Sequence, residues 1–385
     1  MNSHAALPPV DLLRKLPLEE QLVGVNAKTG PYLMTDAGKS LRRVKGFQSQ
    51  TNTFHVMSRT CGGAVFWDDV EKEALRRVLW RLAEFCGVRL LTYCVMGNHF
   101  HALVEVPDQK RWVEEQFGGP QGEERLMRHL RVLYSKVFVE QLQEDFAELR
   151  KRGSEAVVQH RLGLLKKRFC DVAVYMREVK QRFSRWYNKR HKRKGTLWMD
   201  RFRSVLVEGK GDPLLAMAAY IDLNPVRGGL VSDPKDYRWC GYAEALGGNK
   251  ECQRGICRVT GRDASETDWV KSGAREGYRR ILFTTGREVK TADGGAIARR
   301  GVSVEQAEEV LKAGGKLSLG ELVRSQVRHF TAGAVIGSKE FVNGYFERYR
   351  GQFGASRRDG ARQIRAAEGS LHALRDLRAD SSFSS

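Results

Sequence analysis

Residues 88–106, VRLLTYCVMGNHFHALVEV, contain the pattern that decides the fold. The segment Val88–Met96 is apolar almost throughout, which predicts a largely buried strand. Gly97-Asn98 is typical of a tight turn, and His99–Val106 has the composition of a returning strand that ends before Pro107. The sequence therefore predicts a β-hairpin at this point.

Elements on both sides of the hairpin extend the pattern to β-α-β-β-α-β. In chain order they are the strand Thr53–Arg59, an amphipathic helix capped by Asp68 or Asp69 and ended at Gly87, the hairpin, the basic helix Val172–Lys192 and the strand Ser204–Val207. A further helix, Asp212–Asn224, follows the pattern. We expect Asp212 to be the N-cap of the last helix, with Pro213 at its first position. The predicted fold class is α+β, a ferredoxin-like antiparallel sheet with helices on one face and an open face for a ligand.

The remaining residues are expected to form four further parts. Residues 1–47 lack sustained periodicity and predict a poorly ordered arm, and 108–170 predict a helical insertion within a 48–245 domain. Residues 246–354 predict a helical C-terminal domain, either a helix-turn-helix module or a plain bundle, and 355–385 a disordered tail. The C-terminal helices are expected at Thr260–Leu282, Ser303–Ala313, Ser318–Val327 and Ser338–Arg350.

Composition limits the class of protein. The 385 residues include 66 Lys and Arg against 46 Asp and Glu, a net charge of +20, and 41% are hydrophobic, which argues against wholesale disorder. No apolar run reaches the about 18 residues of a membrane-spanning helix. The start lacks the apolar core of a signal peptide, and the seven scattered cysteines suit free thiols. We therefore expect a cytoplasmic protein without a membrane partner.

The positive charge is concentrated between Arg177 and Arg203, where only Glu178 and Asp200 oppose eleven basic residues. Aromatic residues are interleaved with these charges. The segment could bind a nucleic acid through phosphate contacts and base stacking, or it could be a solvated basic helix whose aromatic side chains face the core. The charge density favours nucleic acid over a small acidic metabolite.

Two histidines stand at alternate positions of the returning strand. Side chains at i and i+2 share one face of a strand, so His99 and His101 lie side by side while Phe100 points to the core. Such a pair can chelate a divalent metal ion, with a third ligand from elsewhere, or can be two structural histidines. The spacing alone leaves both interpretations open.

A second pair of polar residues ends the following helix. Tyr220 and Asn224 are four residues apart and therefore share a helix face. A tyrosine oxygen can attack phosphorus and stay covalently attached, so the energy of the broken phosphodiester is conserved for rejoining. The alternative makes Tyr220 a core aromatic residue and Asn224 a helix cap before Pro225.

Four motifs in order resemble those of the REP-associated tyrosine transposases, which belong to the HUH single-strand transposase superfamily. The resemblance covers roughly residues 48–245. The motifs are Phe54–Arg59 (FHVMSR), Tyr93–His101 (YCVMGNHFH), Gly195–Phe202 (GTLWMDRF) and Tyr220–Arg227 (YIDLNPVR).

The resemblance implies an HUH nuclease domain that uses Mg²⁺ or Mn²⁺ to cut single-stranded or hairpin DNA. It implies that His99, His101 and Asn224 hold the metal and that Tyr220 is the nucleophile, forming a 5′-phosphotyrosine and a free 3′-OH. It is compatible with a monomer or a homodimer. The DNA contacts suggested by charge and stacking are Arg182, Arg185, Lys189, Arg190, Trp198 and Arg203.

The sequence departs from the family pattern at Gly97, where relatives commonly have proline, and in the length of the 108–170 insertion. The shortest members lack the region after Gly247. Three other functions are compatible with parts of the sequence: a DNA-binding regulator derived from a transposase, a nuclease that uses water instead of Tyr220, and an RNA-binding module. The last requires exposed aromatic residues on the central strands, for which Tyr93 is the main candidate.

Overall fold

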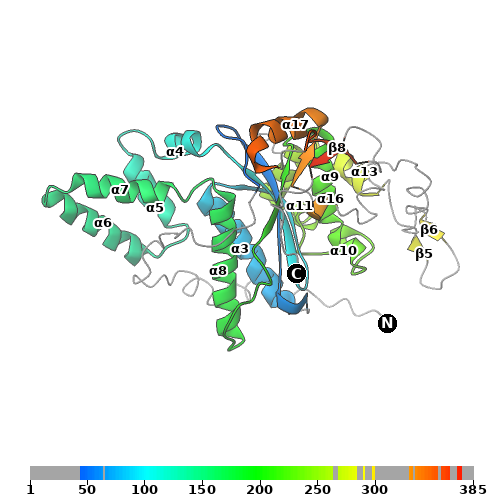
Figure 1. Cartoon of the computed structure of the whole chain (residues 1–385). Helices are drawn as coiled ribbons and strands as arrows, with labels where there is room; N and C mark the ends of the chain where they lie inside the picture. Colours follow the sequence, from blue (N-terminus) through cyan, green and yellow to red (C-terminus); the bar gives the residue numbers. More distant parts are fainter. Residues whose placement is uncertain are drawn as a thin grey trace, which may run out of the picture.

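A mixed sheet runs through the centre of the protein (Figure 1). The computed structural model describes residues 44–63, 66–262, 268–283, 289–290, 297–299, 329–332, 334–353, 357–364 and 371–374. In this part of the chain the main sheet has seven strands in the order β2-β3-β1-β4-β7-β9-β8, and all neighbours are antiparallel except β4 and β7. The strands are β1 Asn52–Arg59, β2 Arg89–Val95, β3 His99–Val106, β4 Arg203–Val207, β7 Val335–Gly337, β8 Arg362–Gln363 and β9 His372–Leu374, with β5 Val289–Lys290 and β6 Ile297–Arg299 paired separately.

Helices lie on both sides of this sheet (Figure 1). Helices α3 and α8 cover one side, and α9, α10, α11 and α16 lie on the other. The helices are α3 Asp69–Cys86, α4 Gln109–Phe117, α5 Gly122–Leu130, α6 Lys136–Lys151, α7 Glu155–Lys166, α8 Val172–Arg190, α9 Gly211–Asp222, α10 Asn224–Arg227, α11 Gly241–Leu246, α12 Lys250–Val259, α13 Ala274–Phe283, α16 His329–Ala332 and α17 Lys339–Arg348, with short 3₁₀ turns at Cys61–Gly63, Pro234–Asp236 and Arg350–Gln352.

The predicted α+β class and β-hairpin are confirmed. The Met96 amide donates to the His99 carbonyl at 2.8 Å, which closes the turn at Gly97-Asn98. Helix α3 has the expected ends: Asp68 forms a capping box with Glu71, and Gly87 ends the helix with a φ of 64°. Between Gln109 and Lys166 the chain forms the helices α4 to α7.

The prediction that helices pack on one face only is wrong. Successive side chains of a strand point to opposite faces, and in β2 both faces are covered. Thr92 donates a hydrogen bond to Asp222 of α9 at 2.8 Å, whereas the ring of Tyr93 packs against Trp80 of α3 with centroids 6.2 Å apart. Tyr93 is fully buried, so the RNA-binding alternative loses its exposed aromatic residue.

The start of α9 also differs from the prediction. Asp212 is not the N-cap, because the helix begins at Gly211 and the capping position belongs to Lys210. Asp212 lies in the first turn, where a negative charge still interacts favourably with the helix dipole. The helix ends at Asp222, so Asn224 begins the separate short helix α10.

The C-terminal region is not the purely helical domain that its sequence predicts. Strand β7 lies parallel to β4, with Val335 opposite Leu206, and β8 and β9 continue the sheet from the expected disordered tail. Val335 and Ile336 are β-branched and fully buried, which favours a strand.

Other expectations for the C-terminal region have mixed outcomes. In place of one helix Thr260–Leu282 there is α13, Ala274–Phe283, whereas α17 confirms the helix expected at Ser338–Arg350. The helices expected at Ser303–Ala313 and Ser318–Val327 lie outside the described residues, as does the N-terminal arm through residue 43. Across the described ranges, no helix is both long enough and apolar enough to cross a membrane.

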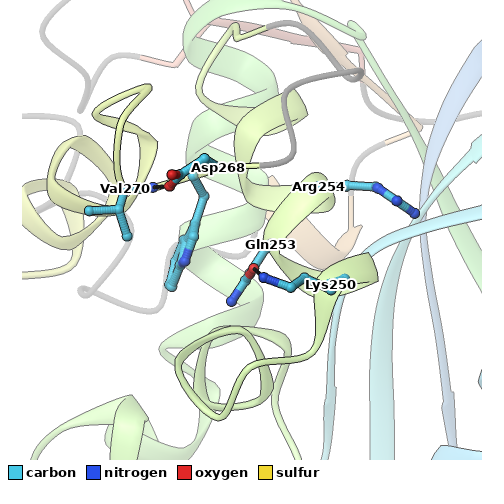
Figure 2. Close-up of a pocket in the computed structure, with 6 residues that line it drawn as sticks. Lys250, Gln253, Arg254, Asp268 and Val270 are labelled. Atoms are coloured by element: carbon cyan, nitrogen blue, oxygen red, sulfur yellow. Dashed lines mark hydrogen bonds between the residues drawn. The ribbon is translucent and has the colours of Figure 1, made fainter.

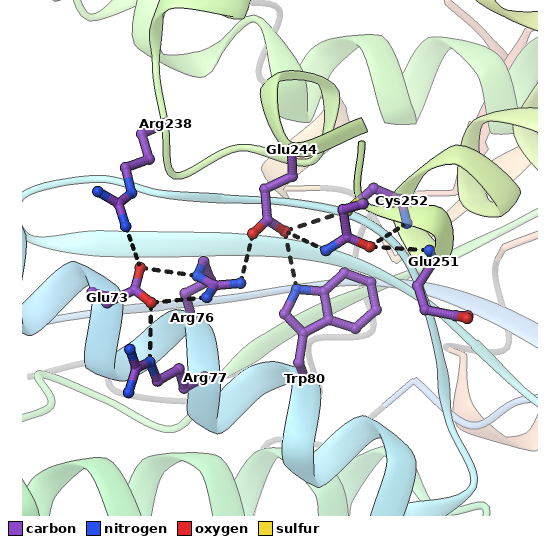
Figure 3. A network of polar contacts seen from close by, with 9 residues as sticks. Glu73, Arg76, Arg77, Trp80, Arg238, Glu244, Glu251 and Cys252 are labelled. Atoms are coloured by element: carbon purple, nitrogen blue, oxygen red, sulfur yellow. Dashed lines mark hydrogen bonds and ion pairs between the residues drawn. The ribbon is translucent and has the colours of Figure 1, made fainter. Parts of the chain in front are cut away.

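A network of partly buried ion pairs joins α3 to α11 beside β2 (Figure 3). Arg76 contacts Glu73 at 2.8 Å and Glu244 at 2.6 Å, and Glu244 also accepts a hydrogen bond from the indole of Trp80 at 3.2 Å. Burial raises the pKa of Glu73, but the hydrogen bonds from Arg76 and Arg77 outweigh it and hold the pKa below its ordinary value.

Replacing Arg76 with Met is expected to lower the free energy of unfolding by about 3 kcal/mol, because the buried carboxylate of Glu73 and the half-buried carboxylate of Glu244 lose a shared partner. Urea unfolding at pH 7 measures this loss. Since the pKa of Glu73 is lower in the folded state, its contribution is present above the ordinary value of 4.5 and is lost as the pH falls below it. The difference between wild type and variant should therefore shrink in acid. Arg77→Met, at a more exposed side chain, is the control, and equal losses in both variants would contradict the prediction.

Candidate active site

The predicted nucleophile and the predicted metal-binding histidines come together on one face of the sheet. His101 lies opposite Met57 in the β1–β3 pair, and His55 shares the face of Met57 because it stands two residues earlier. Helix α9 places Tyr220 over this face. The ring centroid of Tyr220 lies 6.1 Å from that of His55 and 6.1 Å from that of His101.

The histidine pair is held neutral by its surroundings. The rings of His99 and His101 are nearly perpendicular, with centroids 5.2 Å apart. Burial lowers the pKa of His99 to about 4, and burial together with nearby charges lowers that of His101 well below its ordinary value. Neutral imidazole is the form that binds a metal ion.

Hydrogen bonds determine which nitrogen of His99 is available. Asn98 donates its amide N–H to the Gly63 carbonyl at 2.5 Å, which turns the amide oxygen toward His99 Nδ1, 2.6 Å away. In the neutral ring Nδ1 therefore carries the proton and Nε2 carries the lone pair. A hydrogen bond also joins the side chains of His99 and Asn224, so the third predicted ligand lies beside the first.

The donor chemistry of these three residues fits a divalent cation, since imidazole nitrogens and an amide oxygen are common metal ligands. Of these three residues, only His99 and His101 belong to the side-chain types that most often bind metal ions, namely His, Cys, Asp and Glu. Within the described ranges, no group of three or more His, Cys, Asp or Glu side chains is arranged to hold a metal ion.

Three residues that sequence reasoning did not select complete the surroundings of Tyr220. The guanidinium of Arg227 lies 4.0 Å from the ring centroid of Tyr220 and donates to the Tyr220 carbonyl at 2.6 Å, and a further hydrogen bond joins the two side chains. Phe330 of α16 stacks on the same ring at 4.9 Å. His55 contacts the ring edge. Arg227 ends the motif YIDLNPVR and His55 lies in FHVMSR, which were available signals, whereas nothing local marks Phe330.

Asp222 anchors the helix that carries Tyr220. It is fully buried and accepts hydrogen bonds from the Thr92 hydroxyl at 2.8 Å, the Tyr278 hydroxyl at 2.5 Å and the Tyr242 amide at 3.2 Å. These partners come from β2, α13 and α11. Burial raises the pKa of Asp222 to about 6, although the three hydrogen bonds act in the opposite direction.

The basic segment has its aromatic residues in the core. Phe183, Trp186, Tyr187 and Trp198 are all buried, so the core interpretation is correct for them. Trp198, predicted as a stacking platform for DNA, instead donates its indole N–H to the Lys180 carbonyl at 3.1 Å. These aromatic side chains pack together in the core. The ring of Phe183, for example, lies 5.4 Å from that of Trp67, measured between ring centroids.

The predicted DNA-contacting cations separate into two groups. Arg182 is buried and ion-paired with Glu178 at 3.1 Å, which corrects its expected place on the surface. Arg190 is partly exposed and pairs with the buried Glu71 at 3.1 Å. Arg185, Lys189 and Arg203 are exposed and available to a polyanion.

A pocket lies between α12 and the segment that precedes α13 (Figure 2). None of the predicted site residues lines it. Its lining residues are Lys250, Gln253, Arg254, Asp268, Trp269 and Val270.

Comparisons with known proteins give one similar structure. No family model matches the chain. No curated protein matches its sequence either. A solved structure of a REP-associated tyrosine transposase bound to a REP hairpin is 12% identical, with a TM-score of 0.34, over 67% of this chain and 99% of that chain. A likeness at this level decides nothing about function.

Proposed function

We propose that the protein is a metal-dependent single-stranded DNA endonuclease and strand transferase of the transposase type, acting on hairpin-containing DNA. One observation carries the proposal. Tyr220 lies beside the neutral imidazole pair of His99 and His101, and Asn224, four residues after Tyr220, contacts His99. A nucleophile and a candidate metal-binding set on separate elements thus share one site.

In the proposed reaction the Tyr220 hydroxyl oxygen attacks the scissile phosphorus. A bond forms between this oxygen and phosphorus as the phenol releases its proton to water, the bond from phosphorus to the 3′ oxygen breaks, and the 3′ oxygen takes one proton from water to become a hydroxyl. Arg227, half-buried against the phenol ring, places a positive charge beside Tyr220, where it can pair with the scissile phosphate. His99, His101 and Asn224 would hold Mg²⁺ or Mn²⁺, which when bound would polarise the phosphate and stabilise the departing oxygen.

The topology supports a ferredoxin-like nuclease domain over residues 48–245. Its elements follow the order β-α-β-β-α-β, and its strands lie in the order β2-β3-β1-β4. The C-terminal strands then extend this sheet at β4.

A non-catalytic DNA-binding regulator is the second candidate. Tyr220 is only 8% exposed and lies under the ring of Phe330, so the nucleophile is covered. A regulator would keep the exposed cations of α8 and bind DNA without cutting it.

Labelled DNA distinguishes the two candidates. The protein is incubated with single-stranded hairpin DNA from the flanks of its own gene and with Mg²⁺ or Mn²⁺, and the products are separated on a denaturing gel. A 3′-end label should move into a protease-sensitive protein adduct, whereas a 5′-end label should appear in a shorter free strand. EDTA should abolish both products. Tight binding without any adduct would support the regulator.

The exposed cations of α8 should carry part of the DNA affinity. Arg185 and Lys189 are four residues apart and share one face of the helix. Replacing both with Ala should weaken binding and reduce the slope of log affinity against log salt by about 1.4, since each contact with a single strand contributes about 0.7. Fluorescence anisotropy at several salt concentrations measures the slope. Lys110→Ala with Arg131→Ala removes equal exposed charge from the insertion, and the same change in slope there would contradict a specific role for α8.

A further inference from the structure

His55 is a buried polar residue for which the proposed reaction has no use. Both of its ring nitrogens form hydrogen bonds: Nδ1 lies 2.9 Å from the Phe330 carbonyl oxygen, and Nε2 lies 2.8 Å from His101 Nδ1. The rings of His55 and His101 stack with centroids 5.0 Å apart. An apolar side chain could fill this space without two buried nitrogens that need hydrogen-bond partners. A buried histidine here therefore points to a role beyond packing.

The direction of the two hydrogen bonds follows from chemistry. A carbonyl oxygen can only accept, so His55 Nδ1 must donate to Phe330. A ring with no exposed surface is neutral because desolvation disfavours its charged form. His55 Nε2 therefore has no proton and accepts one hydrogen bond, which His101 Nδ1 must donate. His101 Nε2 is then the unprotonated nitrogen.

We infer that His55 is a positioning residue, which holds His101 in the tautomer and orientation that leave Nε2 free to bind a metal ion. The inference rests on the proposed function, because it assigns His101 as a ligand. In this arrangement the Phe330 carbonyl fixes the proton position on His55, and His55 in turn fixes the proton position on His101. Helix α16 thus belongs to the site through its backbone as well as through the Phe330 ring on Tyr220.

Mn²⁺ binding to the full-length protein, measured by calorimetry without DNA, tests this role. His55→Leu removes the acceptor for His101 and should weaken Mn²⁺ binding 10- to 100-fold, the usual effect of losing the partner of a metal ligand. His55→Gln keeps an acceptor oxygen on a side chain of similar reach and should recover most of the affinity. A folded His55→Leu protein that binds Mn²⁺ as tightly as wild type would overturn the inference.

Two further measurements separate the possible failures. His101→Ala should lose Mn²⁺ binding if the proposed site is right, so wild type and His101→Ala with equal affinity would reject the metal assignment itself. If His55→Leu does not fold, long-range ¹H–¹⁵N spectra of the wild type decide. They should show His101 protonated at Nδ1 and bare at Nε2, and the opposite tautomer would overturn the inference.

Discussion

Replacing Tyr220 with Phe will abolish the covalent protein–DNA adduct while leaving the affinity for hairpin DNA within about twofold. The change removes one oxygen atom and keeps the ring that stacks on Phe330 and lies under Arg227. Loss of a nucleophile commonly lowers the rate by a factor of about 10⁴ to 10⁶. Denaturing gels with 3′-labelled DNA measure the adduct, and anisotropy measures binding.

Tyr187→Phe provides the matched control, because Tyr187 is a buried tyrosine of the basic helix with no place in the site. It should form the adduct at the wild-type rate. If Tyr220→Phe still cleaves the DNA as fast as wild type, water is the nucleophile and the phosphotyrosine mechanism is wrong.

Asp222→Ala will lower the free energy of unfolding by about 4 kcal/mol. The substitution leaves the Thr92 hydroxyl, the Tyr278 hydroxyl and the Tyr242 amide without their acceptor in the core, and each such loss costs about 1–3 kcal/mol. It also opens a small void. Urea unfolding followed by tryptophan fluorescence measures the change.

Asp222→Asn is the companion variant. It keeps one acceptor oxygen and the volume of the side chain, so it should lose about half as much stability as Asp222→Ala. A loss below about 1 kcal/mol for Asp222→Ala would show that the three partners find other acceptors or water, and that Asp222 does not anchor α9.

Local patterns in the sequence predicted the elements around the hairpin well. The helix cap at Asp68, the helix end at Gly87 and the turn at Gly97-Asn98 depend on neighbours within four residues, and all three are present. Asp212 failed as a cap because the helix began one residue earlier than its most favourable capping residue. Nothing in a local pattern excludes such a shift.

Features that depend on distant contacts could not be predicted. The pairing of β4 with β7 joins Leu206 to Val335, and the side chain of His55 finds its partner at Phe330. The stripe of aromatic residues on α8 has the same spacing whether it faces DNA or the core, so only the packing of α3 against it decided the question. The shared face of His99 and His101 follows from their spacing in the strand, whereas the approach of Tyr220 to this pair depends on the packing of α9 against β3, which no local pattern encodes.

The junction of β4 with β7 also has a consequence for synthesis on the ribosome. Strand β4 leads directly into the helix that carries Tyr220, yet the strand on its outer edge is made more than a hundred residues later. Until β7 is made, the backbone N–H and C=O groups on this edge of β4 lack their partner strand. An unpaired strand edge of this kind can pair with a strand of another chain and promote aggregation. The growing chain also lacks Phe330 over the tyrosine. A chain that ends before Phe330 would therefore lack the ring that covers Tyr220 and would leave this edge of β4 without β7.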